Sequence, residues 1–334
     1  MGRSIGRPPM LRVAVVVALV LTAWVLPATP SSRPPKPVRI ALLTTAFSPW
    51  HSNTNGFRDG LKELGYVEGQ NVAFDVRAAQ GDLSRLPALV AELVSGAPDL
   101  LYCVAGPEAQ ACQKATSTIP IVFTQASDPV TLGLVRSLAR PGGNITGIGS
   151  LRAELTAKRL ELFRELVPSL QRVLVTHDPR EPEERAALDA ARPAAARSGV
   201  ALLERPVTAT PDVEAGLAAL KPGGRDGILI VQPGLNLNIP GRSLEVATSN
   251  RIPTMYPASF WSNYGALASY GPDQYLQGRQ AARLAGRILS GTPPAELPVE
   301  LPDRIEFVVN LKTAKLLGLE APQTALLRAD RLIQ

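Results

Sequence analysis

The chain has 334 residues, of which 45% are hydrophobic and 19% are charged, and its formal net charge is +6. This length exceeds one compact core and suits two lobes of ordinary size, and the composition excludes a disordered chain. Basic residues are scattered rather than clustered into a stripe, so we expect no nucleic-acid partner.

The first 30 residues have the pattern of an export signal. Arg3, Arg7 and Arg12 precede an apolar run at 13–26, which fits a signal peptide and is short for a membrane span. Subtracting these three arginines from +6 leaves +3 for the rest of the chain. Residues 27–29 lack a small-x-small cleavage pattern, so a cleaved leader and an uncleaved N-terminal membrane tether both stay open. We expect export to the periplasm or another extracytoplasmic space in either case. We expect no lipid anchor, because no cysteine stands directly after the apolar run.

Residues 38–145 predict a complete α/β lobe. The first strand, 38–44, is a near-continuous apolar run, which is typical of a central parallel strand covered on both faces. Strands and helices then alternate, which predicts a doubly wound parallel sheet with right-handed crossovers. The further strands are expected at 71–76, 99–104 and 119–124, and the helices near 57–64, 84–95, 107–116 and 130–139.

A second α/β lobe is predicted over 146–270 by the same alternation. Residues 271–334 then predict a crossover helix and a C-terminal segment that returns between the lobes, part of which completes the first lobe. Several chain crossings make a hinge, and a hinge between two lobes makes a cleft that closes on a ligand. The fold class expected is therefore α/β, with two doubly wound parallel-sheet lobes joined by a multi-crossing hinge.

Catalytic motifs are missing from the sequence. No dinucleotide or P-loop motif occurs, and the serine of Gly147-Ile148-Gly149-Ser150-Leu151 is misplaced for a nucleophile elbow. The two histidines, His51 and His177, do not stand at metal-ligand spacing. We therefore predict no catalytic residue, metal or cofactor, while a hydrolase with a dispersed catalytic triad stays as a less favoured alternative.

The two cysteines, Cys103 and Cys112, fall in a predicted strand and in the helix that follows it. An oxidising compartment would allow a disulfide between them. Two separate buried thiols explain the sequence equally well, so both alternatives stay open.

Several blocks of sequence together resemble the ABC-transporter substrate-binding family that includes tryptophan- and tyrosine-type binders. They are the stretches at 115–123, 127–130, 137–147, 269–273, 297–300, 310–315 and 317–319. The resemblance implies a type I periplasmic-binding-protein fold and delivery of a small molecule to an ABC permease and ATPase pair. The chain departs from the family where Ser127-Asp128-Pro129 replaces Gly-Asp-Pro, so the ligand is not inherited with the fold.

Candidate ligand-binding residues follow from the rule that ligands bind beyond the carboxyl ends of strands in open α/β sheets. Trp50 offers an apolar face and an N–H donor, and Gly106-Pro107 opens a helix whose free amides favour a carboxylate. Asp128 is expected either to cap a helix or to pair with a ligand amine. The full set is Ser48, Trp50, His51, Gly106, Pro107, Thr124, Ser127 and Asp128 from the first lobe, and Asp178, Gln232, Tyr256 and Trp261 from the second.

These observations predict a monomeric solute-binding protein that takes an amino acid or related small carboxylate into an interlobe cleft and catalyses nothing. A sensory binding protein that docks on a membrane signalling receptor is the alternative, because it needs the same closing cleft.

Overall fold

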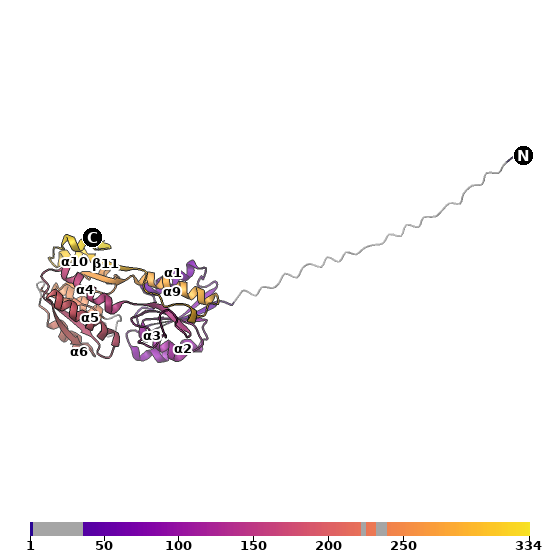
Figure 1. The fold of residues 1–334 in the computed structure, drawn as a ribbon, viewed down its shortest axis with the longest axis horizontal. Coiled ribbons are helices and arrows are strands. Elements are labelled where there is room, and N and C mark those ends of the chain that lie inside the picture. The colour runs from indigo at the N-terminus through magenta and orange to yellow at the C-terminus, as the bar shows by residue number, and fades with distance from the viewer. Residues whose placement is uncertain (3–35, 222–224, 232–238) are drawn as a thin grey trace. The chain divides into compact units, whose positions relative to one another are not determined.

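The computed structural model describes residues 1–2, 36–221, 225–231 and 239–334, and not the side chains of 210, 239 and 240. Lys36–Gln334 forms one compact unit, which holds two sheets with helices packed against them (Figure 1). The predicted export signal, apart from its first two residues, lies outside the described residues.

The first sheet has five parallel strands in the order β2-β1-β3-β4-β5. Its core has a cluster on each face, and the ring of Phe57 stacks on that of Tyr102 in one of them, with centroids 3.8 Å apart. The strands are β1 (Val38–Thr44), β2 (Val72–Ala78), β3 (Leu100–Val104), β4 (Ile121–Ala126) and β5 (Ile145–Gly149). The helices of this lobe are α1 (Ser52–Glu63), α2 (Leu86–Ser95), α3 (Gly106–Ala115) and α9 (Gln274–Leu289), with 3₁₀ turns at Leu83–Arg85 and Pro294–Glu296.

The second sheet has seven strands in the order β12-β11-β10-β9-β8-β6-β7, parallel except for the β10–β11 pair. The strands are β6 (Arg172–His177), β7 (Ala201–Pro206), β8 (Asp226–Leu229), β9 (Thr254–Tyr256), β10 (Ala268–Pro272), β11 (Ile305–Asn310) and β12 (Arg331–Ile333). The helices are α4 (Arg152–Leu166), α5 (Pro182–Ser198), α6 (Thr210–Ala218), α7 (Ile239–Asn250), α8 (Phe260–Asn263), α10 (Leu311–Leu316) and α11 (Gln323–Leu326). The two sheets with their helices are called the first and second lobes below.

The chain crosses between the lobes three times: from β5 to α4, from β10 to α9, and from the turn at Pro294–Glu296 to β11. The second crossing puts α9 against α1 (Figure 1). A Cβ on Gly278 would lie 1.9 Å from the carbonyl oxygen of Asn53, so only glycine lets the two helices approach this closely. The predicted class of two doubly wound α/β lobes with a multi-crossing hinge is confirmed.

The prediction of a helix over 130–139 is wrong, because the chain forms turns and bends there. The Asp128 carboxylate accepts hydrogen bonds from the backbone N–H groups of Val130 and Thr131, which starts a single turn. Gly133 then adopts a φ of +71°, which ends the turn. The hydrophobic residues Leu134 and Val135 still pack into the core, and this explains the apolar spacing that imitated a helix.

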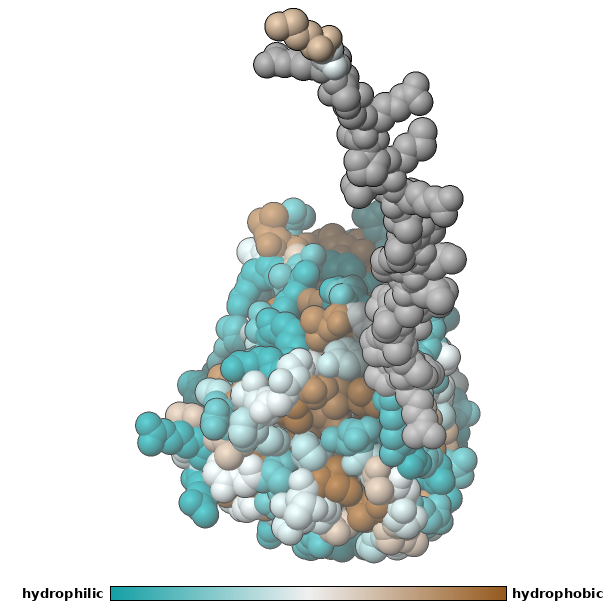
Figure 2. Space-filling model, turned by 90° about the vertical axis from the view of Figure 1, so that its right-hand side faces the viewer, coloured by the Kyte–Doolittle hydropathy of each residue, from teal (hydrophilic) through white to brown (hydrophobic). Residues whose placement is uncertain are grey.

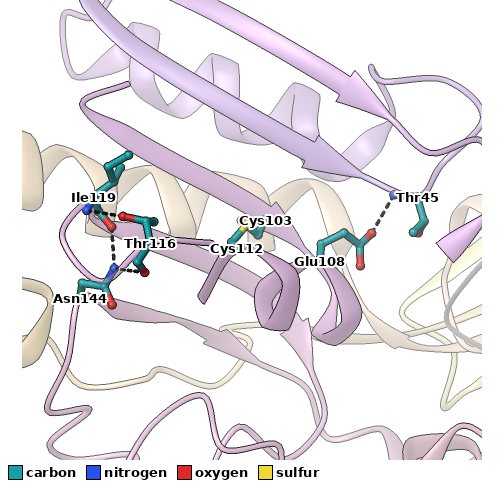
Figure 3. The surroundings of a disulfide bond; sticks show 7 residues. All are labelled: Thr45, Cys103, Glu108, Cys112, Thr116, Ile119 and Asn144. Atoms are coloured by element: carbon teal, nitrogen blue, oxygen red, sulfur yellow. Dashed lines mark hydrogen bonds between the residues drawn. A yellow bond between two sulfur atoms is a disulfide. The ribbon is translucent and has the colours of Figure 1, made fainter. Parts of the chain in front are cut away.

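The two cysteines form a disulfide between β3 and α3 (Figure 3). This settles the alternative that the sequence left open. In the space-filling view of one face, polar residues predominate and hydrophobic residues gather in small patches (Figure 2). No helix in the described part of the chain is long and apolar enough to cross a bilayer.

Candidate functional site

Both lobes contribute residues to one cleft, which has a cavity volume of about 570 Å³. The first lobe supplies the ends of β1, β3 and β4, the segments that follow β1 and β3, and Gln274 at the start of α9. The carboxyl ends of the parallel strands meet there. The second lobe supplies α8 and the residue after it. The lining residues are Thr44, Thr45, Ala46, Phe47, Ser48, Trp50, His51, Ser52, Val104, Ala105, Glu108 and Gln125, then Phe260, Trp261, Tyr264 and Gln274.

Aromatic rings from both lobes make much of the cleft wall. In the first lobe Trp50 packs edge-on against Phe74, with centroids 5.9 Å apart, and the Arg58 guanidinium lies 4.7 Å from the Trp50 ring centre. In the second lobe Trp261 lies beside Phe260, with ring centroids 4.9 Å apart. These rings offer flat apolar surface to a ligand.

His51 stands at the N-cap of α1, where its backbone N–H donates to the Thr54 hydroxyl over 2.9 Å. Its Nε2 atom lies 3.3 Å from the Thr44 hydroxyl. Burial lowers the pKa of His51 to about 4, because it disfavours the charged ring. The imidazole is therefore neutral at neutral pH and can exchange a hydrogen bond with a ligand without adding charge to the cleft.

Glu108 lies in the first turn of α3 and is buried, with 1% of its surface exposed. Its Oε1 atom accepts a hydrogen bond of 2.7 Å from the backbone N–H of Thr45, in the loop after β1 (Figure 3). Among the described residues, Oε2 has no hydrogen-bond partner. Burial raises the pKa of this carboxyl to about 7, and the nearby Glu183 adds to the increase.

Two non-glycine residues of the cleft have left-handed backbone angles: Ala105, with a φ of 79°, and Gln125, with a φ of 60°. Ala105 directly follows β3, and Gln125 lies at the end of β4. Such conformations cost energy and cluster at functional sites, because the surrounding fold must hold them in place.

A smaller cavity of about 50 Å³ adjoins the cleft and shares Gln125, Phe260, Trp261 and Gln274 with it. Arg159 lines this cavity and is 1% exposed. Its guanidinium donates to the Tyr270 carbonyl and the Thr156 hydroxyl, and no carboxylate of the described residues lies within ion-pair distance. Burial lowers its pKa to about 9, so it keeps its positive charge at neutral pH.

Glu183, near the start of α5 in the second lobe, contacts the first lobe. Its Oε1 accepts a hydrogen bond of 2.9 Å from the backbone N–H of Ser127, and its Oε2 pairs with Arg152 over 2.6 Å. A Cβ on Gly106 would lie 2.9 Å from Oε1 of Glu183, so this carboxylate also faces the start of α3. The chain's own carboxylate therefore stands where a ligand carboxylate was predicted, at the N-terminus of α3.

Comparison with known proteins identifies the family. A family model described as ABC transporter substrate binding protein matches residues 49–333. The chain belongs to this family of ABC-transporter substrate-binding proteins. The resemblance stated from the sequence is confirmed.

Relatives of this substrate-binding protein include a curated tyrosine-binding protein of Clostridioides difficile (strain R20291). It is 31% identical over 267 residues, which are 79% of this chain and 76% of the relative. A solved conserved domain protein of Vibrio cholerae is 31% identical, with a TM-score of 0.79 over 89% of this chain and 100% of that one. A Streptococcus pneumoniae domain solved with L-Trp is 24% identical, with a TM-score of 0.77 over 89% and 100% of the two chains, and shows the shared type I fold.

Four predicted ligand residues of the substrate-binding protein line its cleft: Ser48, Trp50, His51 and Trp261. Gln232 lies outside the described residues. The other seven are not among the residues that line this cleft: Gly106, Pro107, Thr124, Ser127, Asp128, Asp178 and Tyr256.

Each of these seven has a physical reason for its place. Thr124 is buried and donates to the Asn53 side chain, and Tyr256 is buried beneath the ring of Trp261. Asp128 caps the turn described above, and Asp178 binds Arg180 in its own loop. Gly106 and Ser127 both lie against Glu183, and Pro107 follows Gly106 in the first turn of α3.

Glu108, Gln125, Phe260 and Tyr264 also line the cleft but were not in the predicted set of ligand-binding residues, although the strand-end rule selects the loops that hold the first three. An acid in the first turn of a helix is common for reasons of helix stability, so its position after a strand did not by itself mark Glu108 as a ligand-binding residue. Its burial depends on the loop after β1, which is 63 residues away in the chain.

Proposed function

We propose that the protein is an extracytoplasmic receptor that captures an amino acid in the cleft and delivers it to the permease and ATPase of an ABC importer, acting as a monomer without catalysis. The observation that carries this proposal is the cleft itself, which both lobes line with aromatic rings. Its volume of about 570 Å³ suits a small molecule. The relative named a tyrosine-binding protein supports an amino acid as the ligand.

Charges around the cleft also suit an amino acid. Glu108 supplies an acid in the cleft, and Arg159 supplies a buried cation in the adjoining cavity. An amino acid carries one group of each sign, so both buried charges would gain a partner when it binds.

Thermal shift with the standard amino acids, followed by calorimetry, tests the ligand class. Binding to the folded state alone raises the free energy of unfolding by about 2.7 kcal/mol at 100 times the Kd, so a ligand is seen as a higher melting temperature. We expect an aromatic amino acid to be among those that raise it. A panel in which no amino acid changes the melting temperature would refute the ligand class.

Delivery is tested separately in cells of the source organism. Deleting the gene should abolish uptake of the radiolabelled ligand, and restoring the intact chain should recover it. Unchanged uptake together with a lost transcriptional or motility response would favour the sensory alternative.

A further inference from the structure

Glu108 is the one acidic side chain among the described residues that line the cleft, and none of those residues is a lysine or arginine. Its Oε1 atom is held by the Thr45 amide, while Oε2 has no partner among the described residues. Leaving a buried carboxylate oxygen without a donor is costly, and native folds rarely do so without a functional reason.

Among the residues that the structure describes, no cation forms an ion pair with this carboxylate. Glu183, on α5, carries the same charge and is itself paired with Arg152. His51, on the loop that leads into α1, is neutral because burial lowers its pKa to about 4. The first-lobe wall of the cleft therefore favours a positively charged group.

We propose that Glu108 determines the specificity of the cleft, and that its Oε2 atom binds a positively charged nitrogen of the ligand. The inference rests on the proposed function, since it assigns the ligand's ammonium group to one residue. It restricts the ligand to amines with a flat or apolar body, because Trp50, Phe260 and Trp261 line the same cleft.

The raised pKa of Glu108 agrees with this assignment. A carboxyl whose pKa is about 7 is only partly ionised at neutral pH, and a bound cation would stabilise the ionised form. Binding of the amine should therefore be accompanied by proton release near neutral pH.

Three probes that share a 4-hydroxyphenyl group test the ligand's amine and carboxylate separately. Tyrosine carries both charges, tyramine lacks the carboxylate, and 3-(4-hydroxyphenyl)propanoic acid lacks the amine. We expect calorimetry on the intact chain at pH 8 to show binding of tyrosine and tyramine, with the deaminated acid at least about tenfold weaker. In Glu108→Gln, tyrosine and tyramine should weaken roughly 10- to 100-fold, as expected for a lost charge-assisted hydrogen bond, and the deaminated acid should not weaken.

Two further variants control for folding. Glu108→Asp keeps the charge but withdraws it by one methylene, so it should bind amines with intermediate affinity. Glu154→Gln is the matched control, because Glu154 is also a first-turn acid but is exposed, on α4. It should bind as the native chain does. Thermal melts of all variants should show one cooperative transition.

The outcomes separate this inference from the proposed function. Equal binding of the deaminated acid, with no effect of Glu108→Gln on the amines, overturns the inference and leaves an amino-acid receptor. An equal loss of all three probes in the variant shows that Glu108 only supports the fold, which also overturns it. Failure of the native chain to bind any probe or any amino acid overturns both.

Discussion

Oε1 of Glu183, on α5 of the second lobe, accepts a hydrogen bond of 2.9 Å from the backbone N–H of Ser127, in the first lobe after β4. The same carboxylate pairs with Arg152, and the side chains are 6% and 10% exposed for Arg152 and Glu183. The Arg152–Glu183 ion pair lies within the second lobe, and the hydrogen bond from the Ser127 backbone N–H joins it to the first lobe, away from the aromatic wall of the cleft.

Glu183→Gln should destabilise the fold by about 3 kcal/mol, because it leaves the buried Arg152 without its counter-ion. Urea unfolding at pH 7 measures this change, with Glu154→Gln as the exposed acid for comparison. A decrease in the free energy of unfolding below about 0.5 kcal/mol, typical of a surface substitution, would show that the pair does not stabilise the fold.

Glu108 should make stability fall with rising pH. Its pKa rises from 4.5 to about 7 on folding, so between these values the folded chain holds a proton that the unfolded chain has lost. That contribution is complete below pH 4.5 and is lost as pH rises to about 7. Over the interval it corresponds to about 3 kcal/mol.

Glu108→Gln removes this dependence, since glutamine does not titrate. Relative to the native chain without ligand, the variant should gain about 3 kcal/mol between pH 4.5 and pH 8, measured by urea unfolding at both values. Parallel stability curves for the two proteins would contradict the assignment of the raised pKa to Glu108.

Tyr264 lines the cleft but is 73% exposed, so its ring can be removed without opening the core. Tyr264→Ala should weaken binding of an aromatic ligand several-fold, by about 1 kcal/mol, and change stability by less than about 0.5 kcal/mol. Calorimetry and urea unfolding measure the two effects. Leu316→Ala, 70% exposed on α10 and outside the cleft lining, is the control. Equal affinity in all three proteins would remove Tyr264 from the site.

The disulfide closes a short loop between cysteines nine positions apart. Loop-closure entropy for such a loop predicts that reduction costs about 3 kcal/mol of stability. Urea unfolding with and without dithiothreitol should show this loss in the native chain. A variant with Cys103→Ala and Cys112→Ala should not respond to the reductant, and a response would mean that the shift has another cause.

Local patterns were sufficient for the architecture. The alternation of apolar strands, such as 38–44, with helix-forming segments predicted two α/β lobes. The rule that ligands bind beyond the carboxyl ends of parallel strands then predicted Trp50, His51 and Trp261 as residues of the cleft. This worked because hydrophobic periodicity reports which face of an element is buried, and parallel strands bring the following loops to one edge.

The same local patterns were insufficient for individual side chains. The apolar spacing at 130–139 imitated a helix, although the Asp128 cap and the φ of Gly133 limit it to turns. Thr124 and Tyr256 stand at the carboxyl ends of strands, where a ligand was expected, but both side chains are buried. Thr124 donates a hydrogen bond to Asn53, and the ring of Tyr256 packs against that of Trp261.

The sequence by itself determined the family, the two lobes and the edge of the sheets at which a ligand would bind. Only the tertiary structure decided that Glu108 is buried against Thr45 and that Glu183 meets Ser127. The physical reason is that both contacts join residues more than 50 positions apart. Burial and hydrogen-bond partners at that range depend on how whole elements pack, which no local pattern encodes.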